Sequence, residues 1–244
     1  MVDRALRQGV WDGKIPIRFS LADRELASLR PPDPVFAAAA RSSYLPVVAR
    51  EALVAFREHA APGDREEIWF DVSGTPLKWQ LPVGVLFDVH GSRSALPWNI
   101  TVHFRSAPDP LVAVEDADAP EWNFYNTLKQ ALFLRYGTTK PMMTLSKTDQ
   151  TQLWEGLVSG SYEQFWAVFR RLVDEAGADI KCVPMRILLP NVPTIQLPHP
   201  PTTDNGQPRT LGDVLGAILP EFDEADESEE GEEEAEEEGE VRAP

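Results

Sequence analysis

Apolar and polar residues alternate in two runs, residues 14–21 and residues 98–104. One face of residues 14–21 is apolar, and so is one face of residues 98–104, while polar or charged side chains occupy the opposite positions. A period of two residues is typical of a β-strand that is buried on one face only. His103 falls among the polar positions of the second run, so we expect its imidazole to face solvent.

The stretch between these two strands contains further pattern signals. Residues 43–60 carry apolar positions at helical spacing, which predicts an amphipathic helix. Residues 67–72 and 76–81 are rich in strand formers and are joined through Ser73-Gly74, which predicts a hairpin. The apolar run 83–89 fits a helix or a strand equally well. Strands and helices mixed in a segment of about 105 residues predict an α+β unit of about the size of ubiquitin.

A helical pattern replaces this alternation beyond residue 120. We expect three helices between residues 120 and 177, the second around 153–157 and the third opened by a capping box of Ser161 and Gln164. The first helix carries an apolar stripe made of Trp122, Tyr125, Leu128 and Leu132.

A third pattern begins near residue 180. Residues 182–189 and 194–197 read as two strands, and Thr210 with Asp213 predicts the capped start of a helix that ends at Pro220. The order strand, strand, helix is the first half of a ubiquitin-like fold.

The charge of the chain is concentrated at its C-terminal end. Residues 221–240 hold 14 of the 39 acidic residues and no Lys or Arg, whereas residues 1–220 hold 25 acidic and 22 basic residues. We expect a solvated, disordered acidic tail over 221–244. The nearly neutral remainder is unlike the strongly basic face of a nucleic-acid-binding protein, so no nucleic acid is expected as a partner.

The sequence contains few candidates for catalytic residues. The single cysteine, Cys182, lies in a predicted strand, where we expect a small buried side chain. The four histidines are scattered and form no metal motif, and no glycine-rich phosphate loop is present. We therefore expect a protein that is not an enzyme and has no catalytic residues, metal or cofactor.

The N-terminal residues lack the apolar core of a secretion signal, and no apolar run reaches the roughly 18 residues that a membrane-spanning helix needs. We expect a cytoplasmic location on this basis.

Seven tryptophans are more than a core of this size usually contains. Two interpretations stay open. Most of these side chains fill interfaces between the parts of the chain, or some of them line a groove for a partner helix, where aromatic anchors concentrate binding energy.

Several segments together resemble the autophagy protein 5 family. The longest runs from Leu96 to Phe104 and reads LPWNITVHF, and shorter ones read WDGKIP at residues 11–16 and GTPLKW at residues 74–79. The motifs QLW at 152–154 and FW at 165–166 extend the resemblance into the helical part. It covers about residues 9–220 and is weakest in 22–42 and 106–121.

The resemblance implies an α+β fold with two ubiquitin-like (β-grasp) units flanking a helix-rich domain. With the patterns above it gives a division of the chain into an N-terminal ubiquitin-like domain (1–105), a linker (106–119), the helix-rich domain (120–178), a partial C-terminal ubiquitin-like domain (179–220) and the acidic tail (221–244). Because the family continues with further elements of its second ubiquitin-like domain, we expect that unit to be incomplete and the sequence to be cut short at its C-terminus.

The resemblance also implies partners. Members of this family are joined by an isopeptide bond to the ubiquitin-like autophagy protein 12, through E2-like conjugating enzymes, and bind the helical N-terminus of autophagy protein 16. The assembly acts like an E3 and promotes transfer of autophagy protein 8 to phosphatidylethanolamine at the preautophagosomal structure membrane. The alternative is an adaptor of the same fold that binds helices and is never conjugated.

Three residues carry these roles in our hypothesis. Lys129, four residues after Tyr125 in a segment that matches the family's acceptor, is the expected isopeptide acceptor, with Lys140 as the second choice. Trp11 and Gly84 lie in matching segments and are expected near the helix-binding groove. Peripheral membrane contact, if direct, would use exposed arginines such as those at 170 and 171, although a solvated helix face is the simpler interpretation.

Overall fold

The computed structural model describes residues 4–27, 30–61, 67–114, 116–173, 180–187 and 195–219. The chain forms two compact units. The first unit comprises Met1–Lys129 with Pro141–Ala176, and the second comprises Gln130–Lys140 with Gly177–Pro244. Each unit is described by itself below.

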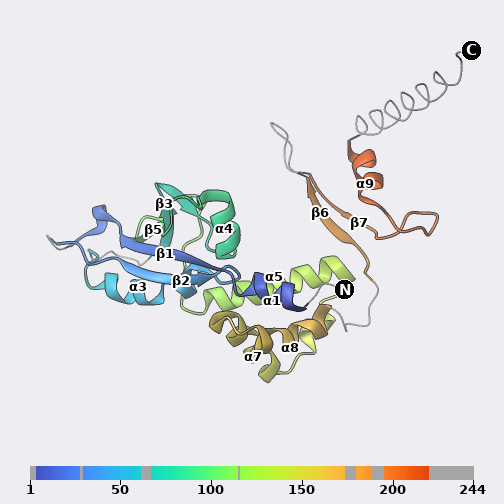
Figure 1. The fold of residues 1–244 in the computed structure, drawn as a ribbon, viewed down its shortest axis with the longest axis horizontal. Helices are drawn as coiled ribbons and strands as arrows, with labels where there is room; N and C mark the ends of the chain where they lie inside the picture. Colours follow the sequence, from blue (N-terminus) through green and yellow to red (C-terminus); the bar gives the residue numbers. More distant parts are fainter. Residues whose placement is uncertain are drawn as a thin grey trace, which may run out of the picture. The chain divides into compact units, whose positions relative to one another are not determined.

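A five-stranded mixed sheet organises the first unit (Figure 1). Its strand order is β2-β1-β5-β3-β4, in which β1 pairs in parallel with β5 and every other pairing is antiparallel. The strands are β1 (Lys14–Leu21), β2 (Val35–Ala40), β3 (Trp69–Val72), β4 (Thr75–Leu77) and β5 (Trp98–His103). A parallel central pair flanked by two antiparallel neighbours is the arrangement expected of a ubiquitin-like unit.

The apolar face of this sheet forms the core, because every second residue of β1 and of β5 is buried and points to that face. Phe19, Phe70 and Ile100 are buried there and belong to one hydrophobic cluster with residues of the covering helices. These helices are α2 (Leu45–Val48), α3 (Arg50–Arg57) and α4 (Val83–His90). The predicted helix 43–60 is thus two helices, with a break at Ala49, and the ambiguous run 83–89 is a helix.

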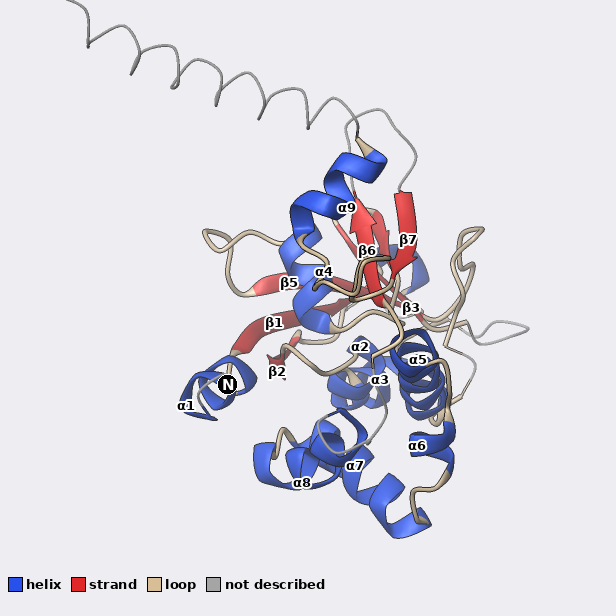
Figure 2. Cartoon of the chain, turned by 90° about the vertical axis from the view of Figure 1, so that its right-hand side faces the viewer, coloured by secondary structure: helices blue, strands red, loops and turns tan. Residues whose placement is uncertain are grey.

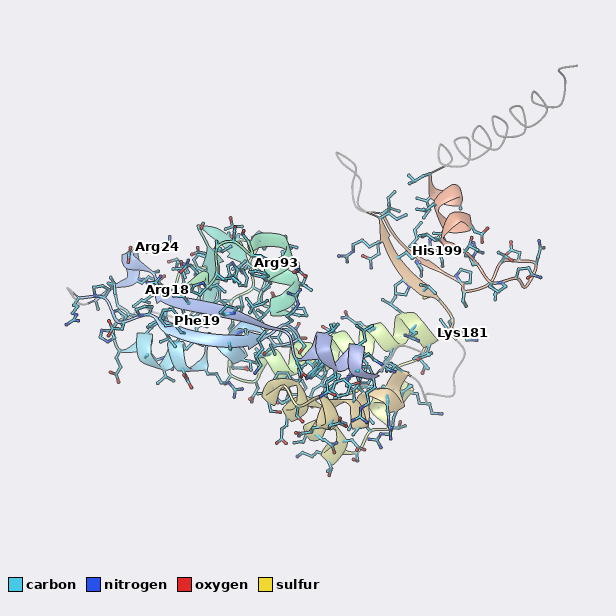
Figure 3. All side chains as sticks on the ribbon, in the orientation of Figure 1. Arg18, Phe19, Arg24, Arg93, Lys181 and His199 are labelled. Carbon is cyan, nitrogen blue, oxygen red and sulfur yellow. The ribbon has the colours of Figure 1, made fainter. Side chains whose placement is uncertain are left out.

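The polar face of the sheet is covered around His103, and the prediction that His103 faces solvent is wrong. His103 is only 4% exposed. Its Nε2 lies 2.5 Å from Asp71 Oδ2, its Nδ1 lies 3.2 Å from Glu25 Oε1, and Trp69 stacks on its ring at 3.7 Å. Glu25 belongs to the short 3-10 helix η1 (Asp23–Glu25), the turn that carries the labelled Arg24 in Figure 3. This turn follows β1 and covers the polar face at His103, which the alternation of β5 alone does not reveal.

The helices outside the β-grasp part are α1 (Arg4–Trp11), α5 (Ala119–Tyr136), α6 (Lys140–Met143), α7 (Lys147–Ser159) and α8 (Tyr162–Val173), shown in Figure 2. Helices α7 and α8 form a tight hairpin. Gly160 ends α7 with φ of 71°, and a Cβ on Gly156 would lie 2.6 Å from Phe165 N, so the two helices meet where only glycine fits. Helix α7 begins at an N-cap, Ser146, as Asp149 N donates a hydrogen bond to its side chain.

The second unit contains the antiparallel pair β6 (Val183–Ile187) and β7 (Ile195–His199), followed by α9 (Leu211–Ile218). The predicted capped start of α9 is confirmed, because the Thr210 side chain accepts from Asp213 N while the Asp213 carboxylate accepts from Thr210 N. These bonds hold the pKa of Asp213 below its ordinary value. The predicted acidic tail, residues 221–244, lies outside the described residues.

Cys182 is not the buried strand residue that the sequence predicts. It precedes β6, is only partly covered, and its Sγ donates a hydrogen bond to the Leu134 carbonyl at the end of α5. Lys181 N also donates to that helix, to Arg135 O at 2.7 Å. The chain is thus held against the helix end before the strand begins.

The sequence patterns did not predict α1, η1, β2 or α6. Strand β2 contains four consecutive alanines, which have little preference for a strand, and it forms because β1 supplies six paired positions. Across the described parts of the chain, every helix is too short or too polar to cross a bilayer.

Candidate functional site

Two surfaces of the first unit contain the residues that the sequence analysis selected. The first, which we term the apolar groove, has a volume of about 480 Å³. It lies among α1, the turn after β2, α4 and α8, and its apolar lining comprises Leu6, Val10, Trp11, Val85 and Trp166. Leu6 and Val10 are 62% and 68% exposed, so α1 presents uncovered apolar surface to this groove.

Trp11 joins α1 to the helical hairpin. Its Nε1 donates a hydrogen bond of 2.8 Å to the carbonyl of Gly160, between α7 and α8. Its ring lies 4.7 Å from that of Phe165 and meets Tyr162 edge-on at 6.2 Å. One face of the indole therefore fixes the position of α1, while the residue also lines the groove.

Gly84 allows α4 to approach the turn after β2. Its N–H donates to Arg41 O at 2.8 Å, and a Cβ at position 84 would lie 2.9 Å from both the Cβ and the carbonyl oxygen of Arg41. Val83 N donates to Ser43 O in the same way. Any side chain at position 84 would force Arg41 or α4 to move, because such a contact is shorter than real Cβ atoms make.

Charged groups also line the groove. The Arg41 guanidinium forms an ion pair with Asp88 and donates to Gly84 O at 3.3 Å. The Arg7 guanidinium lies 5.1 Å from the centre of the Trp166 ring, in a cation–π contact. A groove lined by both apolar and charged side chains is suited to an amphipathic helix, whose anchors recur every three or four residues.

The second surface, which we term the Lys129 pocket, has a volume of about 390 Å³ and follows one face of α5. Glu121, Tyr125 and Lys129 share this face because they are spaced by four residues. Trp122, Met142 and Met143 complete its apolar part, and Asp118 and Gln150 also line it.

Tyr125 connects the pocket to α7. Its hydroxyl donates a hydrogen bond of 2.7 Å to Gln150 O. Burial, and secondly the negative charge of Glu121, raise the pKa of Tyr125 above its ordinary value, so the phenol stays neutral and remains a donor.

Lys129 is half-buried, and it is the one lysine that lines this pocket in the described part of the chain. Its amine is the only nucleophile there that can form a stable amide. Lys140, the second choice, is exposed at the start of α6. The structure thus brings Trp11 and Gly84 to one groove and places Lys129 in a separate pocket.

The two arginines considered for membrane contact lie in the last turn of α8. Arg171 Nη2 forms an ion pair of 2.5 Å with Asp149. The hydrogen bond from the Ser146 hydroxyl, and secondly Arg171, hold the pKa of Asp149 below its ordinary value. The Arg171 guanidinium is therefore already paired with a carboxylate of the same unit. Within the described residues no cluster of three His, Cys, Asp or Glu side chains could hold a metal ion.

Sequence reasoning missed most of the groove. Arg41 and Asp88 come from segments that are far apart in sequence and were given no role, and Trp166 was one of seven tryptophans considered for such a groove. The approach of Gly84 to Arg41 has no local sequence signal, although the exposed apolar positions of α1 could have been noticed from their helical spacing.

Three family models match the chain in sequence order. They are described as the UblA domain of autophagy protein ATG5 (residues 10–104), its alpha-helical bundle region (residues 117–175) and its UblB domain (residues 182–240). The chain belongs to the autophagy protein 5 family. The UblB match extends through residues 221–240, which we had assigned to a tail.

Relatives named autophagy protein 5 agree with this assignment. Those from Aspergillus fumigatus and Drosophila melanogaster are each 32% identical to this chain, over 89% and 88% of it and over 81% and 82% of their own lengths. The protein from Arabidopsis thaliana is 38% identical over 64% of this chain. The chain spans less than half the length of that plant relative and of the rice relatives.

A solved structure supports the fold. The crystal structure of Kluyveromyces marxianus Atg5 superimposes with a TM-score of 0.70 at 22% identity, covering 88% of this chain and 84% of that one. The predicted fold class, ubiquitin-like units with a helical bundle between them, is confirmed. Family membership also supports a role in autophagy, as predicted.

Proposed function

We propose that this chain is a non-catalytic scaffold of autophagosome assembly. Autophagy protein 12 is attached to Lys129 by an isopeptide bond, and a helix of autophagy protein 16 occupies the apolar groove. The assembly then acts like an E3 and promotes transfer of autophagy protein 8 to phosphatidylethanolamine. It works in the cytoplasm and at the surface of the preautophagosomal structure membrane.

The observation that carries this proposal is the apolar groove. Trp11 and Gly84, chosen from the sequence for helix binding, line one groove together although 73 positions separate them. The exposed apolar residues of α1 and the Arg41–Asp88 pair supply what an amphipathic helix needs, which is apolar contact together with charge.

Conjugation at Lys129 is an acyl transfer in which the chain is a substrate. The neutral amine attacks the thioester carbonyl of the charged modifier, a C–N bond forms, the C–S bond breaks, and the conjugating enzyme's cysteine leaves as a thiol after taking the amine proton. A lysine with an ordinary pKa is neutral in only about one molecule in 2,500 at pH 7. The E2-like enzyme must therefore orient the amine and accept its proton.

A conjugation assay tests the covalent part. The purified chain is incubated with the E1-like and E2-like enzymes, ATP and autophagy protein 12, and is followed on a denaturing gel and by mass spectrometry of the branched peptide. We expect one shifted band, with the branch on Lys129, and no shift for Lys129→Arg because arginine stays protonated.

Lys78→Arg is the matched control, since Lys78 lines a different pocket of the first unit, and it should conjugate like the unaltered chain. A shift that persists in Lys129→Arg would contradict the assignment of the acceptor. An unshifted unaltered chain would favour the adaptor that only binds helices.

A further inference from the structure

The five-stranded sheet of the first unit has an open edge at β2. This strand stands first in the order β2-β1-β5-β3-β4 and pairs only with β1 among the strands that the structure describes. An edge strand presents a row of backbone N–H and C=O groups to which another strand can add. No residue of β2 lines the apolar groove or the Lys129 pocket, so this edge is a third surface, separate from both.

The hydrogen bonds of β2 identify the residues that face the open edge. Arg41 N donates to Gly13 O at the end of the ladder between β1 and β2. The backbone groups of an antiparallel strand turn to either side at alternate residues, so the odd-numbered residues of β2 face β1. The even-numbered residues face the open edge, and they are Phe36, Ala38 and Ala40. Ala40 O accepts from Ser43 N, whereas the N–H and C=O groups of Phe36 and Ala38 have no partner among the described residues.

Strand β2 lacks the features that usually protect an edge. Native edge strands carry lysine, proline or a β-bulge, or are very short. β2 has six residues, VFAAAA, with no charge and no proline, and it pairs with β1 over six consecutive positions without a bulge. Its alanine side chains leave room for a second strand to approach. An edge of this kind is suited to strand addition, in which an extended peptide extends the sheet.

The side chains beside the edge indicate the chemistry of the added strand. Phe36 is 62% exposed, so a β-branched apolar side chain across from it would cover it. Lys14 and Arg18 of β1 stand opposite Ala40 and Phe36 on the sheet face that points away from the core (Arg18 is labelled in Figure 3). Arg18 donates to the neutral side-chain oxygen of Asn99, and neither cation is paired with a carboxylate within the described residues. Two uncompensated positive charges favour an acidic partner.

We propose that the open edge of β2 binds an acidic, extended segment of a partner protein as a sixth strand. The backbone of this segment pairs with the N–H and C=O groups of Phe36 and Ala38, and one apolar side chain covers the Phe36 ring. Its carboxylates face Lys14 and Arg18. An added strand lies about 10 Å from β1, two strand spacings away, a distance that a glutamate and a lysine side chain span together. This interaction goes beyond the proposed function, which uses the groove and Lys129.

Two other occupants fit the edge less well. A second copy of the chain would supply its own β2, which contains no acidic residue to meet Lys14 and Arg18. An anionic membrane would meet these two charges, but it presents no extended backbone to pair with Phe36 and Ala38. An acidic peptide strand satisfies both the backbone groups and the charges.

Amide hydrogen exchange of the full chain, followed by NMR, tests the proposal. The probe is a synthetic peptide of about eight residues in which one valine and two glutamates occupy alternate positions, with threonine between them. We expect excess peptide to slow exchange at Phe36 and Ala38 by about tenfold or more. Exchange at Ala37 and Ala39, whose amides already face β1, should stay the same.

Variants then separate the backbone from the charges, with binding of the labelled peptide followed by fluorescence anisotropy. Ala38→Pro removes an N–H that faces the open edge and leaves the ladder with β1 intact, so we expect no measurable binding. Ala38→Val keeps the N–H and is the matched control, which should bind like the unaltered chain. Lys14→Gln/Arg18→Gln should weaken binding about tenfold. Conjugation at Lys129 should be unchanged in all of these variants.

Several results would overturn the proposal. They are unchanged exchange at Phe36 and Ala38 in excess peptide, equal binding by Ala38→Pro and Ala38→Val, and equal binding of a peptide with lysine in place of glutamate. Protection of the same amides by phosphatidylserine-containing vesicles alone would assign the edge to a membrane instead. Protection that accompanies concentration-dependent dimerisation, without peptide, would assign it to a second copy. Each of these outcomes leaves conjugation at Lys129 untouched, so the proposed function stands or falls separately.

Discussion

The apolar groove and the Lys129 pocket are built in different ways. The groove draws on four separate segments, and its shape depends on backbone contacts such as that of Gly84 N with Arg41 O. The pocket follows one face of a single helix, α5, and its edge consists of exposed side chains from α5 and α6. The groove should therefore respond to changes that displace the backbone, and the pocket to changes of side-chain chemistry.

This difference suits two kinds of partnership. A helix held by noncovalent contact needs a wide surface of fixed shape, because its affinity depends on complementarity over many small contacts. A covalent bond, once formed, needs no affinity to persist. The pocket therefore has only to guide one amine and one carbonyl together during the reaction.

The largest expected effect comes from a buried site in the β-grasp sheet of the first unit, which lines neither surface. In His103→Ala the carboxylates of Glu25 and Asp71 stay buried without their common partner. We expect the free energy of unfolding to fall by about 3 kcal/mol, measured by urea denaturation, with both conjugation and helix binding weakened at raised temperature. Arg18→Ala, which breaks an exposed bond to Asn99, is the control and should change the free energy of unfolding by less than about 0.5 kcal/mol. Similar losses in both variants would show that the His103 network contributes nothing special.

The second effect separates the two surfaces. Gly84→Gln places a Cβ about where Arg41 now lies, so the wall of the groove must shift. We expect affinity for a helical peptide of autophagy protein 16 to fall about a hundredfold, or about 2.7 kcal/mol, in isothermal titration calorimetry. Conjugation at Lys129 should proceed at the unaltered rate. Equal loss of both activities would mean that the two surfaces are not independent. Gly212→Gln makes a control, because a Cβ at that position would meet only Thr210 Oγ1, at an ordinary contact distance of 3.7 Å.

A smaller effect concerns the charged groups of the groove. Arg41→Ala removes the partner of Asp88 but leaves the backbone contact with Gly84 in place. We expect the same peptide to bind about tenfold more weakly at low salt, with a smaller difference at 1 M salt, where exposed charges are screened. A loss that is independent of salt would indicate that Arg41 acts by packing alone.

The smallest effect concerns pH. Burial raises the pKa of Tyr44, next to the turn that supports the groove, to about 12. The unfolded chain ionises this phenol near pH 10, so stability is complete below pH 10 and is lost as the pH rises towards 12. The loss at pH 11 should be about 1 kcal/mol, and Tyr44→Phe should remove it in urea titrations at pH 9 and pH 11. An unchanged pH dependence in Tyr44→Phe would assign the loss elsewhere, for example to Tyr125 beside Lys129, whose pKa is raised as well.

The face of α5 shows how far the sequence could lead. Helical spacing alone aligns Tyr125 and Lys129, and the helix forms over Ala119–Tyr136 as the apolar stripe predicts. The strand Trp98–His103 and the capped helix at Thr210 likewise follow from local pattern. In each case the signal lies within one element.

The features that could not be predicted from the sequence depend on residues that are close in space but distant in the chain. The surroundings of His103 include a carboxylate from η1, 78 positions earlier in the chain. The alternation in β5 therefore led to the wrong prediction that His103 faces solvent. Helix α1 is short and arginine-rich, and Trp11 holds it in place through Gly160, 149 positions away. The groove depends on contacts of this kind, and only the family resemblance directed attention to Trp11 and Gly84.

The most direct test of the whole account is the rate at which autophagy protein 8 is joined to phosphatidylethanolamine. The assay uses liposomes, the charged E2-like enzyme of autophagy protein 8, and either the purified Lys129 conjugate or an equimolar mixture of unconjugated chain and autophagy protein 12. The account predicts that the conjugate accelerates lipidation severalfold over the mixture. Equal rates for the conjugate and the mixture would contradict it.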